Sequence, residues 1–224
     1  MIDYLAHLRA DVERVLAVLE GSALTETVAG CPGWTLRELV EHLGNVHRWA
    51  TRIVQSGTVQ EEPTGSPDDP RAWFAAGAAE LLAALAAADP AERCWSFTTD
   101  KTKGFWARRQ SLETVVHRWD AEGAAGSPGP IASQLAAEGV TEVVELMTPR
   151  QVKLGRIPSP PVAVELRATD TGNSWLLGDA AVGASVEGPA ELVLLLLWHR
   201  VDPGDVRLRV EGDAAAVLRL ALTP

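Results

Sequence analysis

The sequence predicts an α+β fold in which a series of helices is followed by a smaller mixed region. Apolar residues recur three or four positions apart through the first two thirds of the chain, which is typical of amphipathic helices. After Pro158 the apolar residues alternate with polar ones, which is typical of strands. We therefore expect two domains, residues 1–150 and 158–224, with the boundary between Arg150 and Pro161.

Five helices are expected in the first domain. The second of them begins at Thr35, a good N-cap, and Glu38 completes a capping box three residues later. The third is rich in alanine and leucine, which favour helix. The segment from Gly57 to Pro70 is rich in Gly, Pro, Ser and acidic residues, which predicts a loop. The expected helices are Asp3–Glu20, Thr35–Val54, Arg71–Ala88, Phe105–Ala124 and Ile131–Met147.

Short strands and two helices are expected in the second domain. Turn-forming residues from Asp170 to Asn173 separate the first two strands. An apolar helix from Pro189 to about Arg200 follows the third strand, and Asp213 is expected to cap a short last helix. The expected strands are Val162–Ala168, Ser174–Leu177, Ala184–Glu187 and Val206–Val210.

The composition excludes several classes of protein. Hydrophobic residues make up 46% and charged residues 22%, as in an ordinary globular chain. A net charge of −10 repels nucleic acid phosphates and anionic lipids, so neither is expected as a partner. The most apolar run, Leu192–Trp198, is far shorter than the roughly 20 residues of a membrane-spanning helix. No export signal opens the sequence, and two cysteines are too few for a disulfide framework, so we expect a cytoplasmic protein.

Glu113 and His117 form the sharpest local chemical signal. Four residues apart on a helix, they lie about 40° apart in projection and can reach one ion. A carboxylate and an imidazole suit zinc, and also iron or nickel. The alternative is an ion pair on a solvated helix face, which this spacing forms more often.

His42 and His47 are five residues apart, or about 140° in projection, so they cannot both face one ion from a regular helix. The periodicity favours His47 for the apolar face, because Leu43 and Ala50 flank it, whereas His42 lies at the edge of that face. We interpret His47 as a core histidine.

Other candidate groups have simpler interpretations. Cys31 precedes a helix and could be a reactive thiol, but a small buried hydrophobe is the favoured interpretation for it and for Cys94. Ser111 lacks the flanking glycines of a hydrolase nucleophile. Most of the eight tryptophans are expected in the core, and some could line a pocket.

Several segments together resemble the mycothiol-dependent maleylpyruvate isomerase family, in the order in which that family carries them. The likeness covers nearly the whole chain. The segments are Cys31-Pro32-Gly33-Trp34-Thr35, Glu41–Leu43, His47–Ala50, Glu113–Glu122, Gly188–Trp198 and Val210–Asp213.

The resemblance implies a DinB-like four-helix bundle followed by a sterol-carrier-like α+β domain, in a cytoplasmic protein of an actinobacterium. It also implies a divalent metal, with zinc preferred, held by His42, Glu113 and His117. This overrides the preference for His47 that periodicity alone gives. Three protein ligands leave a position open for substrate. Asp120, one turn beyond His117, is expected to orient a metal ligand or to be an acid on the helix surface.

The family's chemistry uses the thiol of mycothiol. A thiolate adds to a conjugated double bond, which becomes a rotatable single bond, and its expulsion restores the double bond in the other isomer. If the thiolate stays attached, the enzyme is an S-transferase instead. We expect one of these two activities on a small electrophile. Arg200 is the candidate catalytic residue that would bind an anionic substrate, with Arg207 and Arg209 as alternatives. The protein is expected to be a monomer or a homodimer.

Two other functions remain open at this point. One is a non-catalytic protein that binds a metal and a ligand without turnover. The other is a thiol-independent, metal-dependent hydrolase that uses a metal-bound hydroxide. Dependence of the activity on a thiol separates both from the isomerase or transferase.

Overall fold

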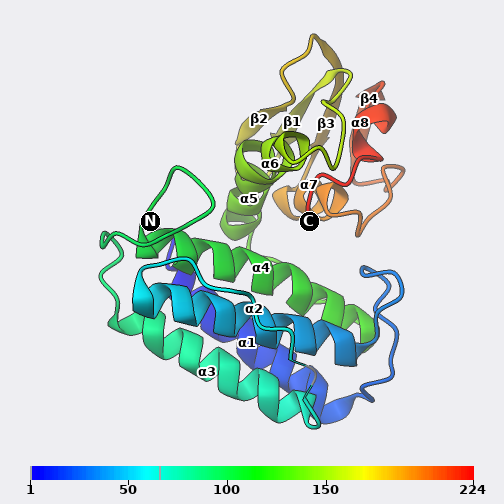
Figure 1. The fold of residues 1–224 in the computed structure, drawn as a ribbon. Coiled ribbons are helices and arrows are strands. Elements are labelled where there is room, and N and C mark those ends of the chain that lie inside the picture. Colours follow the sequence, from blue (N-terminus) through cyan, green and yellow to red (C-terminus); the bar gives the residue numbers. More distant parts are fainter. Residues whose placement is uncertain (1, 66) are drawn as a thin grey trace. The chain divides into compact units, whose positions relative to one another are not determined.

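Four long helices form the first part of the chain (Figure 1). The computed structural model describes residues 2–65 and 67–224, and the chain divides into two units, Met1–Gly129 and Pro130–Pro224. In the first unit α1 contacts α3 and α4, and α2 contacts the same two helices, so the four close into a bundle. The bounds of the helices are α1 Tyr4–Gly21, α2 Leu36–Ser56, α3 Pro70–Ala87 and α4 Lys103–Ala124.

Capping interactions fix where these helices begin and end. The predicted capping box of α2 is confirmed, since the Thr35 N–H donates to Glu38 at 2.8 Å. Gly57 ends α2 with a φ of +71°, a conformation that disfavours residues with a side chain. Thr102 caps α4, its hydroxyl accepting the N–H of Phe105 at 3.2 Å. These caps fix the start of both helices that carry the candidate site.

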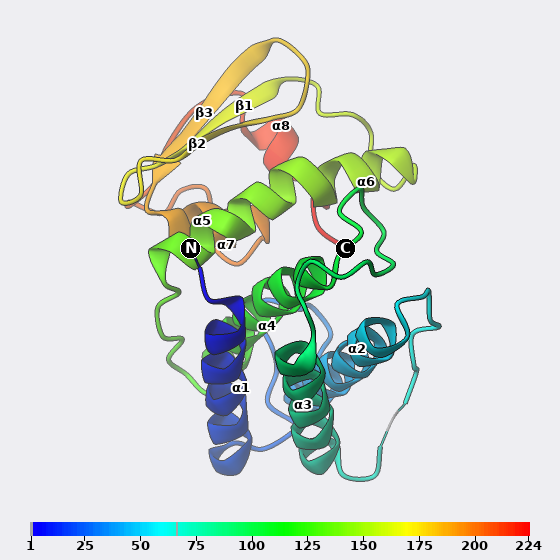
Figure 2. The ribbon, with the colours of Figure 1, turned by 90° about the vertical axis from the view of Figure 1, so that its left-hand side faces the viewer.

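The second unit is a four-stranded sheet with helices against one of its faces (Figure 2). The strand order is β2-β1-β3-β4, with β1 and β3 parallel and the outer pairs antiparallel. The helix α7 contacts β1, β3 and α5. The elements are α5 Ser133–Glu142, a π-helical turn Val143–Met147, α6 Thr148–Lys153, β1 Ala163–Ala168, β2 Ser174–Leu177, β3 Val182–Gly188, α7 Ala190–Leu197, β4 Arg209–Gly212 and α8 Ala215–Leu218.

The α+β class is confirmed, but the division of the chain lies earlier than the predicted boundary between Arg150 and Pro161. The helix predicted at 131–147 was assigned to the first domain, whereas α5 belongs to the second unit and packs on α7. A side chain at Gly139 of α5 would come within 2.8 Å of Leu194, so the two helices approach closely there. Periodicity shows that a helix has an apolar face, but not which partner covers it.

Local differences occur at three other places in the second unit. The predicted fifth helix contains a π-helical turn and continues as α6 to Lys153. The last strand starts at Arg209 rather than Val206, which is 98% exposed. The N-cap of α8 is Ala214 and not Asp213, without a side-chain cap.

No helix among the described residues has the length and apolar character that crossing a bilayer requires.

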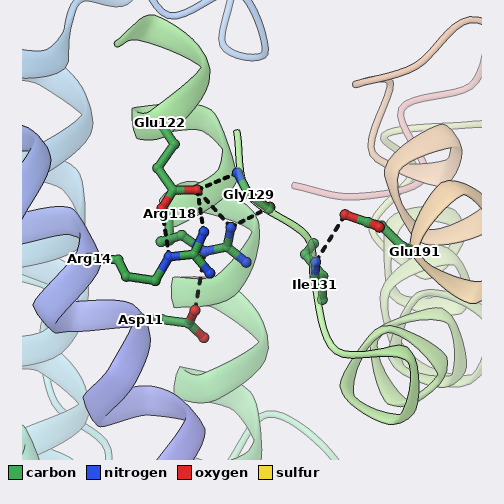
Figure 3. Close-up of polar contacts among 7 residues, drawn as sticks. All are labelled: Asp11, Arg14, Arg118, Glu122, Gly129, Ile131 and Glu191. Carbon is green, nitrogen blue, oxygen red and sulfur yellow. Dashed lines mark hydrogen bonds and ion pairs between the residues drawn. The ribbon is translucent and has the colours of Figure 1, made fainter. Parts of the chain in front are cut away.

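A buried arginine joins α1 to the C-terminal half of α4 (Figure 3). The Arg118 side chain is 1% exposed and contacts Asp11 at 3.1 Å and Glu122 at 2.8 Å. It also donates to the Gly129 carbonyl at 2.7 Å, and the Gly129 N–H donates to Glu122. Arg14 forms a second ion pair with Glu122, at 2.6 Å. Burial raises the pKa of Glu122, but the bonds from Arg118 and Gly129 outweigh this and hold it below its usual range.

After Gly129 the chain enters the second unit, and its backbone is held there as well. The Ile131 N–H donates to the Glu191 carboxylate of α7 at 2.9 Å (Figure 3). Glu191 lies in the first turn of that helix, where a negative charge is stabilising.

Replacing Arg118 by Met should lower the free energy of unfolding of the first unit by about 3 kcal/mol, because the buried Asp11 loses the cation that it contacts and Glu122 keeps only Arg14. Arg14→Met is the matched control. Its side chain is 38% exposed, so the loss should stay below about 1 kcal/mol. Urea denaturation followed by circular dichroism measures both. Equal effects of the two substitutions would contradict the role given to Arg118.

Candidate metal centre

Three side chains that can bind a metal converge between α2 and α4. His42 comes from α2, and Glu113 and His117 lie one turn apart on α4. The Glu113 Oε1 atom lies 3.1 Å from His42 Nε2 and 3.4 Å from His117 Nε2. One ligand atom from each residue lies within 4.8 Å of the other two. This donor set of two imidazoles and one carboxylate fits a divalent ion of the zinc type.

Arg109 holds the other oxygen of Glu113. Its guanidinium contacts Glu113 Oε2 one turn earlier on α4, and both residues are buried. Burial raises the pKa of Glu113, but Arg109 first and then the two histidines outweigh it, so the pKa lies well below its usual value. Glu113 is therefore ionised and presents Oε1 to the two imidazoles. Arg109 was not among the predicted site residues, although its spacing of four from Glu113 is a recognisable signal.

Asp120 contacts the far side of the His117 ring. Its Oδ2 atom lies 3.0 Å from His117 Nδ1, and Asp120 is 2% exposed. The alternative of an acid on the helix surface is therefore wrong. Burial lowers the pKa of His117, but Asp120, Cys31 and Glu113 raise it well above its usual value. A carboxylate at Nδ1 fixes the ring orientation and leaves Nε2 facing Glu113.

His47 is a core histidine, as its position in the apolar stripe predicts. It is fully buried, packs against Phe74 and has Nε2 3.0 Å from the Thr114 hydroxyl. Burial lowers its pKa to about 3, so the ring is neutral. Among the described residues, the groups of three or more donors that could hold a metal do not include His47.

Cys31 does not fit its interpretation as a buried hydrophobe. It packs at the margin of an apolar cluster but is only half-buried, and its Sγ atom lies 3.5 Å from Asp120 Oδ2. No pattern in the sequence indicates this contact, because 89 positions separate the two residues. Cys94 is buried, with its thiol 3.4 Å from the Ile53 carbonyl, as the sequence predicts.

The site opens toward solvent at His42. The His42 side chain is 29% exposed, against 6% for both Glu113 and His117. The ring of Trp34 lies beside it, with the centroids of the two rings 5.3 Å apart. Of the three candidate ligands, His42 is therefore the most accessible.

Arg200, the predicted catalytic residue, lies in the second unit just after α7. Its guanidinium donates to the Trp198 carbonyl at 2.7 Å. With His199 and Arg219 it lines a cavity of about 580 Å³ in that unit. Its expected role in binding an anionic substrate stays a prediction. The alternatives Arg207 and Arg209 are exposed and form ion pairs with the neighbouring residues Asp205 and Glu211.

Two family models match the sequence. The model of the mycothiol maleylpyruvate isomerase N-terminal domain covers residues 5–122, and the model of the C-terminal domain covers residues 134–219. No curated protein sequence matches the chain.

Two solved structures are similar in fold. Both are of a mycothiol-dependent maleylpyruvate isomerase, one of them a histidine-to-alanine mutant, with TM-scores of 0.73 for the mutant and 0.67 for the other. Each is 13% identical in sequence, and the alignment covers 93% of this chain and 92% of that chain. At 13% sequence identity, this structural likeness supports the assignment of the fold.

The low pKa of His47 gives a pH prediction. The unfolded chain takes up a proton at His47 below pH 6.5, while the folded protein does not until about pH 3. The stability from this residue is therefore complete above pH 6.5 and falls with decreasing pH, by about 1.4 kcal/mol per pH unit for one proton. We expect the free energy of unfolding of the metal-free protein, measured by urea denaturation between pH 4 and 6, to depend less steeply on pH in His47→Gln than in the wild type. The difference in slope should correspond to about one proton. An unchanged slope would mean that the folded protein already protonates His47.

Proposed function

Since the chain belongs to the mycothiol-dependent maleylpyruvate isomerase family, we propose that it is an enzyme that brings the thiol of mycothiol to a small electrophile. The metal in this proposal is a divalent ion, with zinc preferred, held by His42, Glu113 and His117. The observation that carries the proposal is the convergence of these three donors from two helices at one solvent-accessible point.

The chain's own residues prepare this site before any ligand arrives. Arg109 keeps Glu113 ionised and occupies its second oxygen, so only Oε1 is directed toward the two imidazoles. Asp120 orients His117 through Nδ1. A divalent ion bound there would lower the pKa of a coordinated thiol and so supply thiolate at neutral pH. Because Arg109 offsets the charge of Glu113, the site favours an anionic ligand.

Isomerase and S-transferase differ only in what happens after the thiolate has added to the substrate. An isomerase releases the thiol again, whereas a transferase leaves it attached to the product. We propose the isomerase first, because the family models and both similar structures carry that name. Arg200 remains the candidate for binding a substrate carboxylate, by virtue of its charge and of the cavity that it lines.

The proposed ligand set predicts which histidine matters for metal binding. His42→Ala, Glu113→Ala and His117→Ala should each weaken zinc binding by at least about a hundredfold, since each removes one of three protein ligands. His47→Ala is the matched control on α2 and should bind zinc as the wild type does. Competition with a chromogenic chelator measures the affinities. If His47→Ala loses the metal while His42→Ala keeps it, the assignment is wrong.

The activity itself is tested with zinc-loaded protein, mycothiol and maleylpyruvate. We expect turnover that requires the thiol and falls at least about a hundredfold in His117→Ala, because the activated thiol contributes several kcal/mol. Chromatography of the products separates an isomerised acid with free thiol from a thiol adduct. Uptake of the electrophile without turnover would support the binding protein instead. Turnover without any thiol would support the hydrolase.

A further inference from the structure

The His117 ring lies between two different groups of donors. Its Nε2 atom faces Glu113 and His42, as described above. Its Nδ1 atom lies on the other side of the ring, 3.0 Å from Asp120 Oδ2. Together with Asp120 and the thiol of Cys31, His117 forms a second group of donors on this side. One ligand atom from each of these three residues lies within 4.8 Å of the other two. We name this group the thiol cluster.

The loop before α2 holds Cys31 against α4. The Val28 N–H donates to the Trp34 carbonyl at 2.9 Å, and within this closed turn the Cys31 N–H donates back to Val28 at 3.0 Å. Val28 is buried in an apolar cluster with Leu36 of α2 and Ala121 of α4. The backbone of Cys31 is thus fixed on both helices, and the thiol of this half-buried residue reaches Asp120.

We propose that the thiol cluster is a second metal site, specific for a thiophilic divalent ion such as cadmium. Thiolate and imidazole are the ligands that such ions prefer, and the carboxylate of Asp120 is a third donor. On binding, the sulfur–metal and nitrogen–metal bonds replace the S–H bond of Cys31 and the Nδ1–H bond of His117, and both protons pass to solvent. The two negative charges of Cys31 and Asp120 then balance the two positive charges of the ion, which favours its burial.

The charges distinguish the two groups of donors. Glu113 is already paired with Arg109, so an ion held by His42, Glu113 and His117 keeps most of its charge for an incoming ligand. The thiol cluster instead supplies two anionic donors of its own. It is therefore suited to holding an ion tightly, and not to activating a substrate.

The two sites share one imidazole, which limits their joint occupancy. A neutral imidazole has a single free lone pair, so His117 serves one group at a time. With an ion in the thiol cluster, Nδ1 is the ligand and the Nε2 proton points toward Glu113 Oε1, 3.4 Å away. A thiophilic ion would thereby withdraw His117 from the catalytic metal. This competition rests on the proposed function, whereas the thiol cluster itself does not.

The test is a cadmium titration of the metal-free full-length chain, followed by the ultraviolet charge-transfer band of a cadmium–thiolate bond. The band should rise with cadmium in the wild type and be lost in Cys31→Ser. Cys94→Ala is the matched control, because it removes the only other thiol of the chain, and it should keep the band. Asp120→Asn should weaken the affinity measured from the band at least about tenfold.

Two further variants separate this proposal from the proposed function. His42→Ala should keep the cadmium–thiolate band, since His42 is no part of the thiol cluster, whereas His117→Ala should weaken it at least about tenfold. Circular dichroism checks that each variant is folded. No band in the wild type, or an undiminished band in Cys31→Ser, overturns the proposal. Zinc binding that is insensitive to His42→Ala, together with a cadmium–thiolate band that Cys31→Ser abolishes, would overturn the first site alone.

Discussion

The arrangement of the site depends on the burial of charged side chains along α4. This helix lies within the bundle with most of its residues buried, and it carries Arg109, Glu113, His117 and Asp120 on the side of the candidate metal centre. A buried charge is costly unless an opposite charge or hydrogen bonds compensate it. Each of these groups has such a partner, and the partners are what fix the side-chain positions. The ion pairs and hydrogen bonds that make the burial of α4 possible therefore also preorganise the site.

The fold and half of the site could be predicted from periodicity and spacing. The capping box at Thr35 and the spacing of Glu113 and His117 are local signals, because each depends only on residues three or four positions apart. The choice between His42 and His47 is different in kind. Periodicity correctly places His47 in the core, but a metal ligand with access to solvent belongs at the edge of the apolar face, where His42 lies. Only the resemblance to a family indicated His42.

What the sequence could not show is contact between distant segments. Cys31 and Asp120 meet because an apolar cluster fixes the loop before α2 against the end of α4, and no spacing rule links such positions. The predicted boundary between the two units differs from the observed one for a similar reason. The helix α5 has an apolar face like those of the bundle helices, and its close fit to α7 at Gly139 depends on a residue more than fifty positions away.

The ion network of Asp11, Arg118 and Glu122 shares no residue with the cluster of donors around Glu113, although both are built on α4. Effects of substitutions at positions without shared partners are close to additive. A descendant of this protein could therefore lose His42, which is only half-buried, while the ion network of Arg118 stayed in place, whereas loss of Glu113 would also require replacement of Arg109. The same scaffold would then be open to divergence into proteins that keep the bundle and lose the proposed metal chemistry. In this architecture, a change of function therefore does not require an intermediate protein that fails to fold.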